Sequence, residues 1–384
     1  MSHTDEVTTD AFLDGRARQL RNRLRATLAA SVAPGVEHRD RTGEFAGPAY
    51  QALAREGLAG VLFPAELGGT GHGTVGYAMA VEEITAVCPA TSLIYMTQTH
   101  AAYPILVAGT PAQQAAYIPD LCAGTAYGSL AVTEPDAGSD VSALRTTAKP
   151  DGDGYLIDGA KTFITNGDVA DVIVLFATVD PAAGRAGVTA FLVPGDAEGL
   201  SRGRPFEKMG MHGSSTVELF LDRVRVPATA RLGPEGGGWP VTMRSVTKSR
   251  ISAAAQGVGI ATAAYAAVAG RFRAAGPIPP ELGFRLAGLR SRVLAGRALL
   301  YATAAAVDRD ERDSVAAVSA AKLFCTDLGV QVADEACALL GADGDRADLG
   351  VERLLRDAKV TQIYDGTNEI QRLIIARDTA GRLT

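Results

Sequence analysis

Twenty consecutive residues without a charged side chain, Ile251–Gly270, restrict the possible folds of this chain more than any other feature. A helix with no charged face is stable either in a protein core or across a lipid bilayer. Polar residues interrupt the stretch at Ser252, Gln256 and Thr262, and most of the others are alanine or glycine. We therefore expect a buried helix in a bundle and no membrane span.

Helical patterns continue on both sides of this stretch. Earlier in the chain, apolar residues recur with helical spacing over Val75–Val87 and Ser92–Val107. Later, Arg285–Asp308 has a long helical pattern, and the three prolines within Ala275–Pro280 separate it from the charge-free stretch. A further helix is expected where apolar residues lie three and four positions apart, at Val318, Ala321, Cys325, Leu328, Val332, Ala336 and Leu339.

The middle of the chain changes to the period of β-strands. We expect a hairpin in which Asp158-Gly159 is the turn between Tyr155–Ile157 and Lys161–Ile164. Three more runs have the length and apolar content of strands, namely Asp171–Val179, Val188–Val193 and Ser215–Pro227. The order of elements predicts an α+β fold with an N-terminal helical domain (1–125), a middle β-barrel or sandwich domain (126–235) and a C-terminal helical bundle (236–384).

Composition excludes several classes of function. The net charge of −6 and the pI of about 5.5 give no electrostatic basis for nucleic-acid binding. The four cysteines are scattered and the five histidines form no ligand pattern, so neither a metal site nor a disulfide framework is expected. The polar, acidic segment Met1–Asp10 does not resemble a signal peptide, which favours a cytoplasmic location.

Two short motifs in the middle region have the composition of a cofactor site. Thr133–Asp140, with the sequence TEPDAGSD, follows the apolar strand Tyr127–Val132. Such a loop can bring backbone N–H groups close to a ring or a phosphate, although an ordinary turn has similar residues. In Lys161–Gly167, Phe163 and Thr165 would share one face of a strand, either as a flavin contact or as a pair in the domain core.

Three further motifs complete an ordered set: Lys208–Thr216, Arg356–Lys359 and Ile363–Arg372. In this order and spacing the five motifs resemble the acyl-CoA dehydrogenase family, over nearly the whole chain from Tyr50 to Thr379. The resemblance implies a C-terminal four-helix bundle, FAD bound between the β domain and the bundle, and a homo-oligomer, either dimer or tetramer. An acyl-CoA or an acyl carrier protein would be the substrate, and an electron-transfer flavoprotein a possible acceptor.

The resemblance also implies roles for individual residues. Thr133 would bond the pyrimidine edge of the flavin, Thr165 would lie near N5, and Phe163 would stand where relatives usually have a stacking tryptophan. The full set implied for FAD is Val132, Thr133, Ser139, Phe163, Thr165, Arg271, Thr367 and Glu369. Arg271, or Arg273 in its place, would reach the pyrophosphate of the FAD in a neighbouring subunit. The set implied for the substrate is Ser139, Arg250 and Arg377.

The expected chemistry needs a carboxylate that removes a proton from Cα of a thioester, while Cβ loses a hydride to flavin N5. Relatives usually place a glutamate in the motif that here contains Asp365, and some carry it where this chain has Ser249. Asp365 is therefore the predicted base, with a side chain shorter by one methylene. If Asp365 is structural, Glu82 or Glu83 is the next candidate.

Three alternatives to an acyl-CoA dehydrogenase stay open at this stage. The chain could oxidise an acyl or aminoacyl group held on a carrier protein, as in specialised metabolism. It could be a flavin oxidase resembling nitroalkane oxidase, which also uses an aspartate base. It could also be a relative that binds little FAD and serves as a scaffold, because the arginine segment near Arg271 departs from the family pattern.

Overall fold

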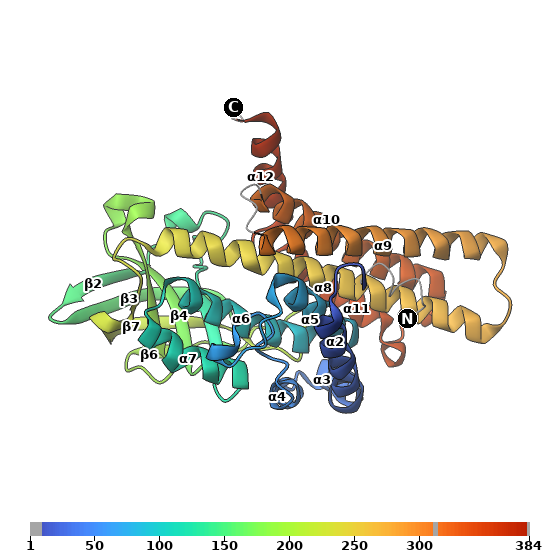
Figure 1. The fold of residues 1–384 in the computed structure, drawn as a ribbon, viewed down its shortest axis with the longest axis horizontal. Coiled ribbons are helices and arrows are strands. Elements are labelled where there is room, and N and C mark those ends of the chain that lie inside the picture. The colour runs from blue at the N-terminus through green and yellow to red at the C-terminus, as the bar shows by residue number, and fades with distance from the viewer. Residues whose placement is uncertain (1–9, 310–313, 382–384) are drawn as a thin grey trace.

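The computed structural model describes residues 10–309 and 314–381, so most of the polar segment Met1–Asp10 lies outside it. Helices come first along the chain, a β domain follows, and long helices complete it (Figure 1). This confirms the predicted α+β class. The β domain forms one end of the molecule, and α8 (Gly238–Ala275) runs from it into the helical part.

The N-terminal region is helical, and α2, α4 and α7 pack on its two longest helices, α5 and α6. The helices are α2 Gly15–Thr27, α3 Val36–Thr42, α4 Gly47–Arg55, α5 Gly73–Val87, α6 Pro89–Ala108 and α7 Pro111–Ala123. Local sequence fixes where α7 begins and ends: Thr110 and Gln113 form a capping box, and Gly124 ends the helix in the left-handed conformation.

The β domain is an eight-stranded mixed sheet with the order β6-β7-β3-β2-β4-β5-β8, and β1 pairs in parallel with β4. The strands are β1 Gly128–Ala131, β2 Thr147–Asp151, β3 Gly154–Thr165, β4 Val172–Thr178, β5 Val188–Pro194, β6 Leu200–Arg202, β7 Thr216–Pro227 and β8 Arg231–Leu232. The predicted alternation in β7 is present, because Val217, Leu219 and Leu221 are all buried in the core of the sheet.

The predicted hairpin turn at Asp158-Gly159 is wrong. Both residues lie inside the continuous strand β3, where the pairing with β7 shifts between Ile157 and Gly159. A Cβ on Gly159 would lie 2.6 Å from the Thr146 hydroxyl oxygen, so glycine is needed there for close approach rather than for a turn. The actual turn is one strand earlier, since Asp151 pairs with Gly154 across two residues.

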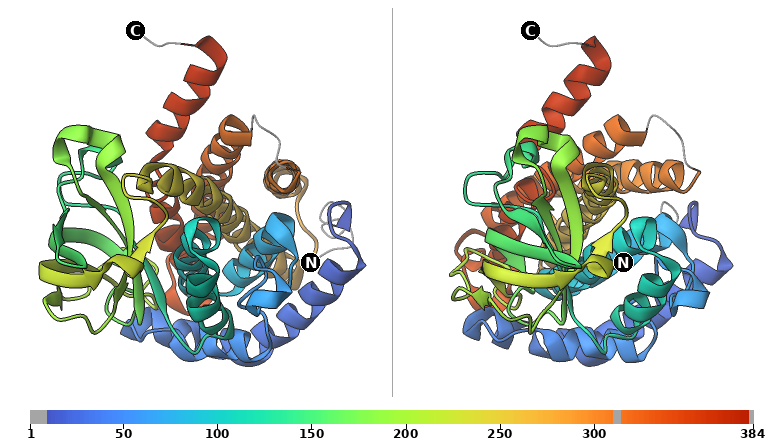
Figure 2. Two further views of the ribbon diagram at one scale, coloured as in Figure 1. Left: turned by 60° about the vertical axis from the view of Figure 1, so that its left-hand side comes forward. Right: turned by 90° about the vertical axis from the view of Figure 1, so that its left-hand side faces the viewer.

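Within its described residues, the C-terminal region contains three long helices and two shorter ones. They are α8, α9 Pro280–Asp308, α10 Ser314–Leu340, α11 Val351–Lys359 and α12 Asn368–Ala380. In both views of Figure 2, α12 projects away from the body of the molecule. Asp308, at the end of α9, accepts hydrogen bonds from the backbone of Thr74 (2.7 Å) and Val75 (3.0 Å), and so caps α5 from the other end of the chain.

The charge-free stretch of α8 is buried within a single chain. Ile251, Ala254, Ala255 and Val258 pack in one core with residues of α5, α6, α9 and α10. Both α8 and α10 are long and apolar enough to cross a membrane, but 72% of the most apolar window of α8 is buried inside the protein. This burial is typical of a core helix, and it explains the missing charges without a partner subunit.

Candidate functional site

Asp365 lies on the loop between α11 and α12, with its backbone in the left-handed region at a φ of 57°. Its carbonyl oxygen accepts hydrogen bonds from Arg250 Nε (3.3 Å) and Gln371 Nε2 (3.4 Å), which support this uncommon conformation. The side-chain atom Oδ2 is buried and accepts no hydrogen bond from any residue that the structure describes. A buried carboxylate oxygen without a hydrogen-bond partner lowers the stability of the fold, and such groups are typical of functional sites.

The surroundings of Asp365 combine positive charge with enclosure. Arg250 is buried on α8, and this burial lowers the pKa of its guanidinium while the charge of Asp365 opposes the shift. Lys322 on α10 is also buried. Burial lowers the pKa of its ammonium group to about 8, and the charge of Asp365 again opposes this shift. Lys322 Nζ donates to Asn368 Oδ1 over 2.8 Å, so it ties α10 to the first residue of α12 beside the Asp365 loop.

The two alternative carboxylates from the sequence are both engaged elsewhere. Glu82 is buried in an ion pair with Arg297 (2.6 Å) and also accepts a hydrogen bond from Tyr301. Glu83 pairs with Arg25 over 2.7 Å. Both oxygens of each carboxylate therefore already accept hydrogen bonds. Among the carboxylates weighed from the sequence, only Asp365 keeps an oxygen unpartnered.

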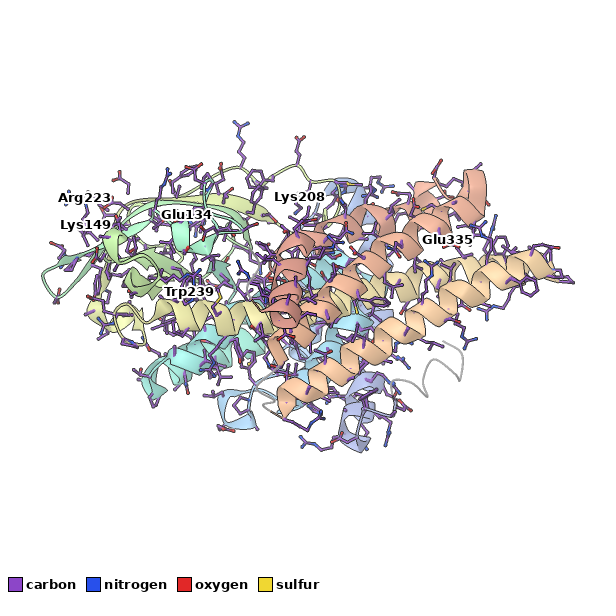
Figure 3. All side chains as sticks on the ribbon, turned by 90° about the horizontal axis from the view of Figure 1, so that it is seen from above. Glu134, Lys149, Lys208, Arg223, Trp239 and Glu335 are labelled. Atoms are coloured by element: carbon purple, nitrogen blue, oxygen red, sulfur yellow. The ribbon has the colours of Figure 1, made fainter. Side chains whose placement is uncertain are left out.

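Val132 and Thr133, at the end of β1, are joined to β3 by a buried ion pair. Lys161 Nζ lies 2.8 Å from Glu134 Oε1 and donates to the Val132 carbonyl oxygen over 3.1 Å. The Thr133 carbonyl oxygen accepts from the backbone of Thr162 over 2.9 Å. Figure 3 shows Glu134 within the β domain. These contacts bring two of the sequence motifs together and fix their relative position.

Phe163 stands on a bulge of β3, with a φ of 57° and a side chain that is 66% exposed. Its ring packs at a tilt against that of Phe206, with the ring centroids 5.1 Å apart. The bulge breaks the strand alternation from which Phe163 and Thr165 were placed on one face, and Thr165 is half-buried. An exposed aromatic side chain on a backbone with positive φ is unusual in a β-strand. This combination favours a role for Phe163 in binding.

Asn166 follows this bulge and is fully buried, yet both polar atoms of its side chain are without hydrogen bonds among the described residues. Such atoms normally find a partner. An exposed ring beside an unpartnered amide fits a flat group with a polar edge, so the residues present are compatible with a flavin.

The remaining predicted residues are distributed along the molecule. Thr367 caps α12 by accepting from the backbone of Ile370, and Glu369 is exposed in the first turn of that helix. Ser139 is exposed on the loop after β1.

Arg271 and Arg377 are not brought to the Asp365 loop in the single chain. Arg271, near the end of α8, forms an exposed ion pair with Asp343 over 2.6 Å. Arg377 is exposed in the last turn of the projecting helix α12.

Sequence reasoning missed His100, whose ring lies beside the same turn of α8 that contacts Asp365. Its Nε2 is 3.0 Å from Ser252 Oγ. A single histidine in an apolar helical pattern gives no signal of its own. The combination with Ser252, 152 positions later, appears only after folding.

Comparisons with known proteins agree on one family. The N-terminal, middle and C-terminal domains of acyl-CoA dehydrogenase match residues 15–125, 129–224 and 236–380. The chain is 40% identical over 371 residues to an acyl-CoA dehydrogenase of Bacillus subtilis, covering 94% of this chain and 97% of the relative.

Two solved structures have the same fold over almost their entire length. Butyryl-CoA dehydrogenase of Megasphaera elsdenii is 32% identical with a TM-score of 0.91, covering 96% of this chain and 98% of that one. The prolyl acyl carrier protein oxidase AnaB is 31% identical with a TM-score of 0.91, covering 96% and 100%.

Proposed function

Because this chain belongs to the acyl-CoA dehydrogenase family, whose members are flavoprotein oxidoreductases, we propose that it dehydrogenates an acyl thioester between Cα and Cβ. The observation that supports this most directly is the buried, unpartnered Oδ2 of Asp365 next to the buried Arg250. The proposed domain limits are 1–125, 126–235 and 236–384.

We propose that Asp365 removes the proton from Cα. The buried cations Arg250 and Lys322 lie close to Asp365, whose charge opposes the lowering of both of their pKa values. Enclosure excludes water, so an ionised oxygen without hydrogen bonds is a stronger proton acceptor than a solvated one. Ser139, Arg250 and Arg377 are the residues proposed to bind the substrate.

FAD is the proposed cofactor, and when bound it supplies the acceptor for the hydride from Cβ. The chain would hold it through Val132, Thr133, Ser139, Phe163, Thr165, Thr367 and Glu369, with Arg271 contributed across a subunit interface. An electron-transfer flavoprotein is the proposed electron acceptor. A cytoplasmic location stays a prediction from the sequence.

The proposed reaction is tested by anaerobic titration of the FAD-loaded protein with acyl-CoAs of increasing chain length. A substrate should bleach the visible absorbance of the flavin and release an enoyl thioester. If no acyl-CoA bleaches the flavin while dithionite does, dehydrogenation of acyl-CoA is excluded.

A second candidate substrate is an acyl group attached to a carrier protein. The likeness to a prolyl acyl carrier protein oxidase supports it, at 31% identity. The same titration with matched acyl-CoA and acyl-carrier thioesters distinguishes the two, and oxygen consumption during turnover distinguishes an oxidase from a dehydrogenase.

Replacing Phe163 by alanine should weaken FAD binding about fivefold, since an aromatic contact contributes roughly 1 kcal/mol beyond its buried area. The stability of the apoprotein should change little, because the ring is 66% exposed. Flavin absorbance after dialysis measures the occupancy. Phe220→Ala is the matched control, as Phe220 is another exposed phenylalanine of the same sheet, 43% exposed on β7. Equal flavin retention in the two variants would contradict a stacking role.

A homo-oligomer is proposed from the family and from the projecting α12, whose residues Leu373, Ile374 and Ile375 are only partly buried. The apolar surface of α8 gives no further support for an interface, because it is already covered within one chain. Light scattering at micromolar concentration should give two or four times the chain mass of 39.7 kDa. A mass equal to a single chain would refute the oligomer.

A further inference from the structure

His100 offers an unused hydrogen-bond acceptor deep in the protein. Its Nε2 lies 3.0 Å from Ser252 Oγ, and the Ser252 hydroxyl donates its own proton to the Ser249 carbonyl oxygen over 2.7 Å. A hydroxyl has one proton, so Ser252 accepts from His100 Nε2–H. Burial lowers the pKa of His100, which keeps the ring neutral. Nδ1 therefore carries a lone pair, and no residue that the structure describes donates a hydrogen bond to it.

The ring of His100 lies near Asp365, since both contact the same turn of α8. Ser252 and Arg250 belong to one turn of α8, and Arg250 Nε donates to the Asp365 carbonyl oxygen over 3.3 Å. The charge of Asp365 also acts on His100. His100 remains partly accessible although its neighbours on α6, Thr99 and Ala101, are fully buried, so part of its ring lines open space and does not pack against side chains.

Tyr77 on α5 is a buried polar neighbour of the same turn of α8. Its hydroxyl lies beside Ser252 and Thr99 but forms no hydrogen bond of good geometry with any described residue. The tyrosine is completely buried, and the charge of Asp365 reaches it as well. An unpartnered hydroxyl, an imidazole lone pair and an unpartnered carboxylate oxygen thus lie around one turn of α8.

The accessible imidazole of His100 is poorly suited to a saturated alkyl chain. Covering an unsatisfied polar group with hydrocarbon removes it from water without replacing its hydrogen bond, which weakens binding. A hydroxyl on the acyl chain could donate to His100 Nδ1, whereas the buried Tyr77 Oη is not accessible to a ligand. We propose that His100 selects acyl thioesters that carry a hydroxyl group a few bonds from the carbons being oxidised. This rests on the proposed dehydrogenation and names its substrate class.

The test compares two probes of equal size, 4-hydroxybutyryl-CoA and pentanoyl-CoA, which differ by a hydroxyl in place of a methyl group. For the wild-type protein, kcat/KM for flavin reduction should favour the hydroxylated probe by at least about tenfold, the equivalent of one hydrogen bond. His100→Leu, which keeps the size but removes the acceptor, should reverse the preference. Thr97→Val is the matched control, because Thr97 is buried on the same helix and bonds only within it, to the Leu93 carbonyl oxygen.

Binding gives a second readout that does not need turnover. Calorimetry with the products 4-hydroxybut-2-enoyl-CoA and pent-2-enoyl-CoA should show the same preference in Kd and the same reversal in His100→Leu. If binding discriminates but neither probe reduces the flavin, the specificity stands and the proposed dehydrogenation fails. Equal affinities in the wild type, no binding of either product, or an unchanged ratio in His100→Leu would each overturn the specificity. Should His100→Leu fail to fold, the wild-type ratio decides.

Discussion

Asp365→Asn should reduce the flavin with its best acyl thioester about 10²–10⁴-fold more slowly than the wild type, the usual loss when a positioned base is removed. FAD binding and stability should be retained, because the replacement has nearly the same shape and the bonds to the Asp365 backbone remain. Stopped-flow absorbance under anaerobic conditions measures the rate. Asp378→Asn is the control, since this aspartate is exposed on the projecting α12.

Asp365→Glu shows whether the site is built for the shorter acid. The extra methylene moves the carboxylate by roughly 1.5 Å, and misplacement on that scale can lower a rate on the order of 100-fold. A site shaped around aspartate should therefore lose activity with glutamate as well. A gain toward simple acyl-CoAs would show that the pocket still fits the usual glutamate. If Asp365→Asn keeps the wild-type rate, Asp365 is structural.

Lys161→Met should destabilise the protein by about 3–5 kcal/mol, the range for breaking a buried ion pair by removing one partner. Lys161 is inaccessible and Glu134 is 5% exposed, so the carboxylate left behind would be charged in a dry environment. Glu134 would keep only the backbone donors of Arg145 and Thr146. The loop that begins at Thr133 should loosen, and flavin occupancy should fall together with the melting temperature.

Two comparisons isolate the effect of the ion pair. In Lys161→Met/Glu134→Gln no charge remains buried, so the double variant should recover part of the loss. Arg225→Ala removes an exposed pair with Asp151 in the same domain, and should change stability by only about 0–1 kcal/mol. Urea unfolding of the apoproteins gives the free energies. If Lys161→Met is no less stable than Arg225→Ala, the buried pair does not hold the loop.

Sequence patterns predicted elements well where one periodicity held along the whole element. The apolar residues spaced three and four apart on α10 and the alternation on β7 depend only on which face is buried, and both were confirmed. The Asp158-Gly159 turn was wrong because an aspartate-glycine pair also suits a bulge. Which one forms depends on Thr146, a residue of the neighbouring segment that local sequence does not identify.

The sequence identified separate parts of the site, and only the folded structure shows how they lie together. Motifs identified Asp365 and the segments around Thr133 and Phe163, since each stands in a recognisable run of residues. The role of Asp365 stays a prediction. His100, Tyr77 and Ser252 come from three different helices, and no spacing along the chain relates them. Their significance follows from unpartnered atoms, which only three-dimensional contacts reveal.

The path of α8 has a consequence for how this protein can be divided. Its first turns pack near β5, its middle is enclosed by α5, α6 and α10, and Asp308 caps α5 from the end of α9. A fragment that ends before α8 would leave the apolar faces of α5 and α6 open to water. The three regions are therefore parts of one cooperative folding unit, and exchange of a single region between relatives would require matching surfaces along the whole of α8.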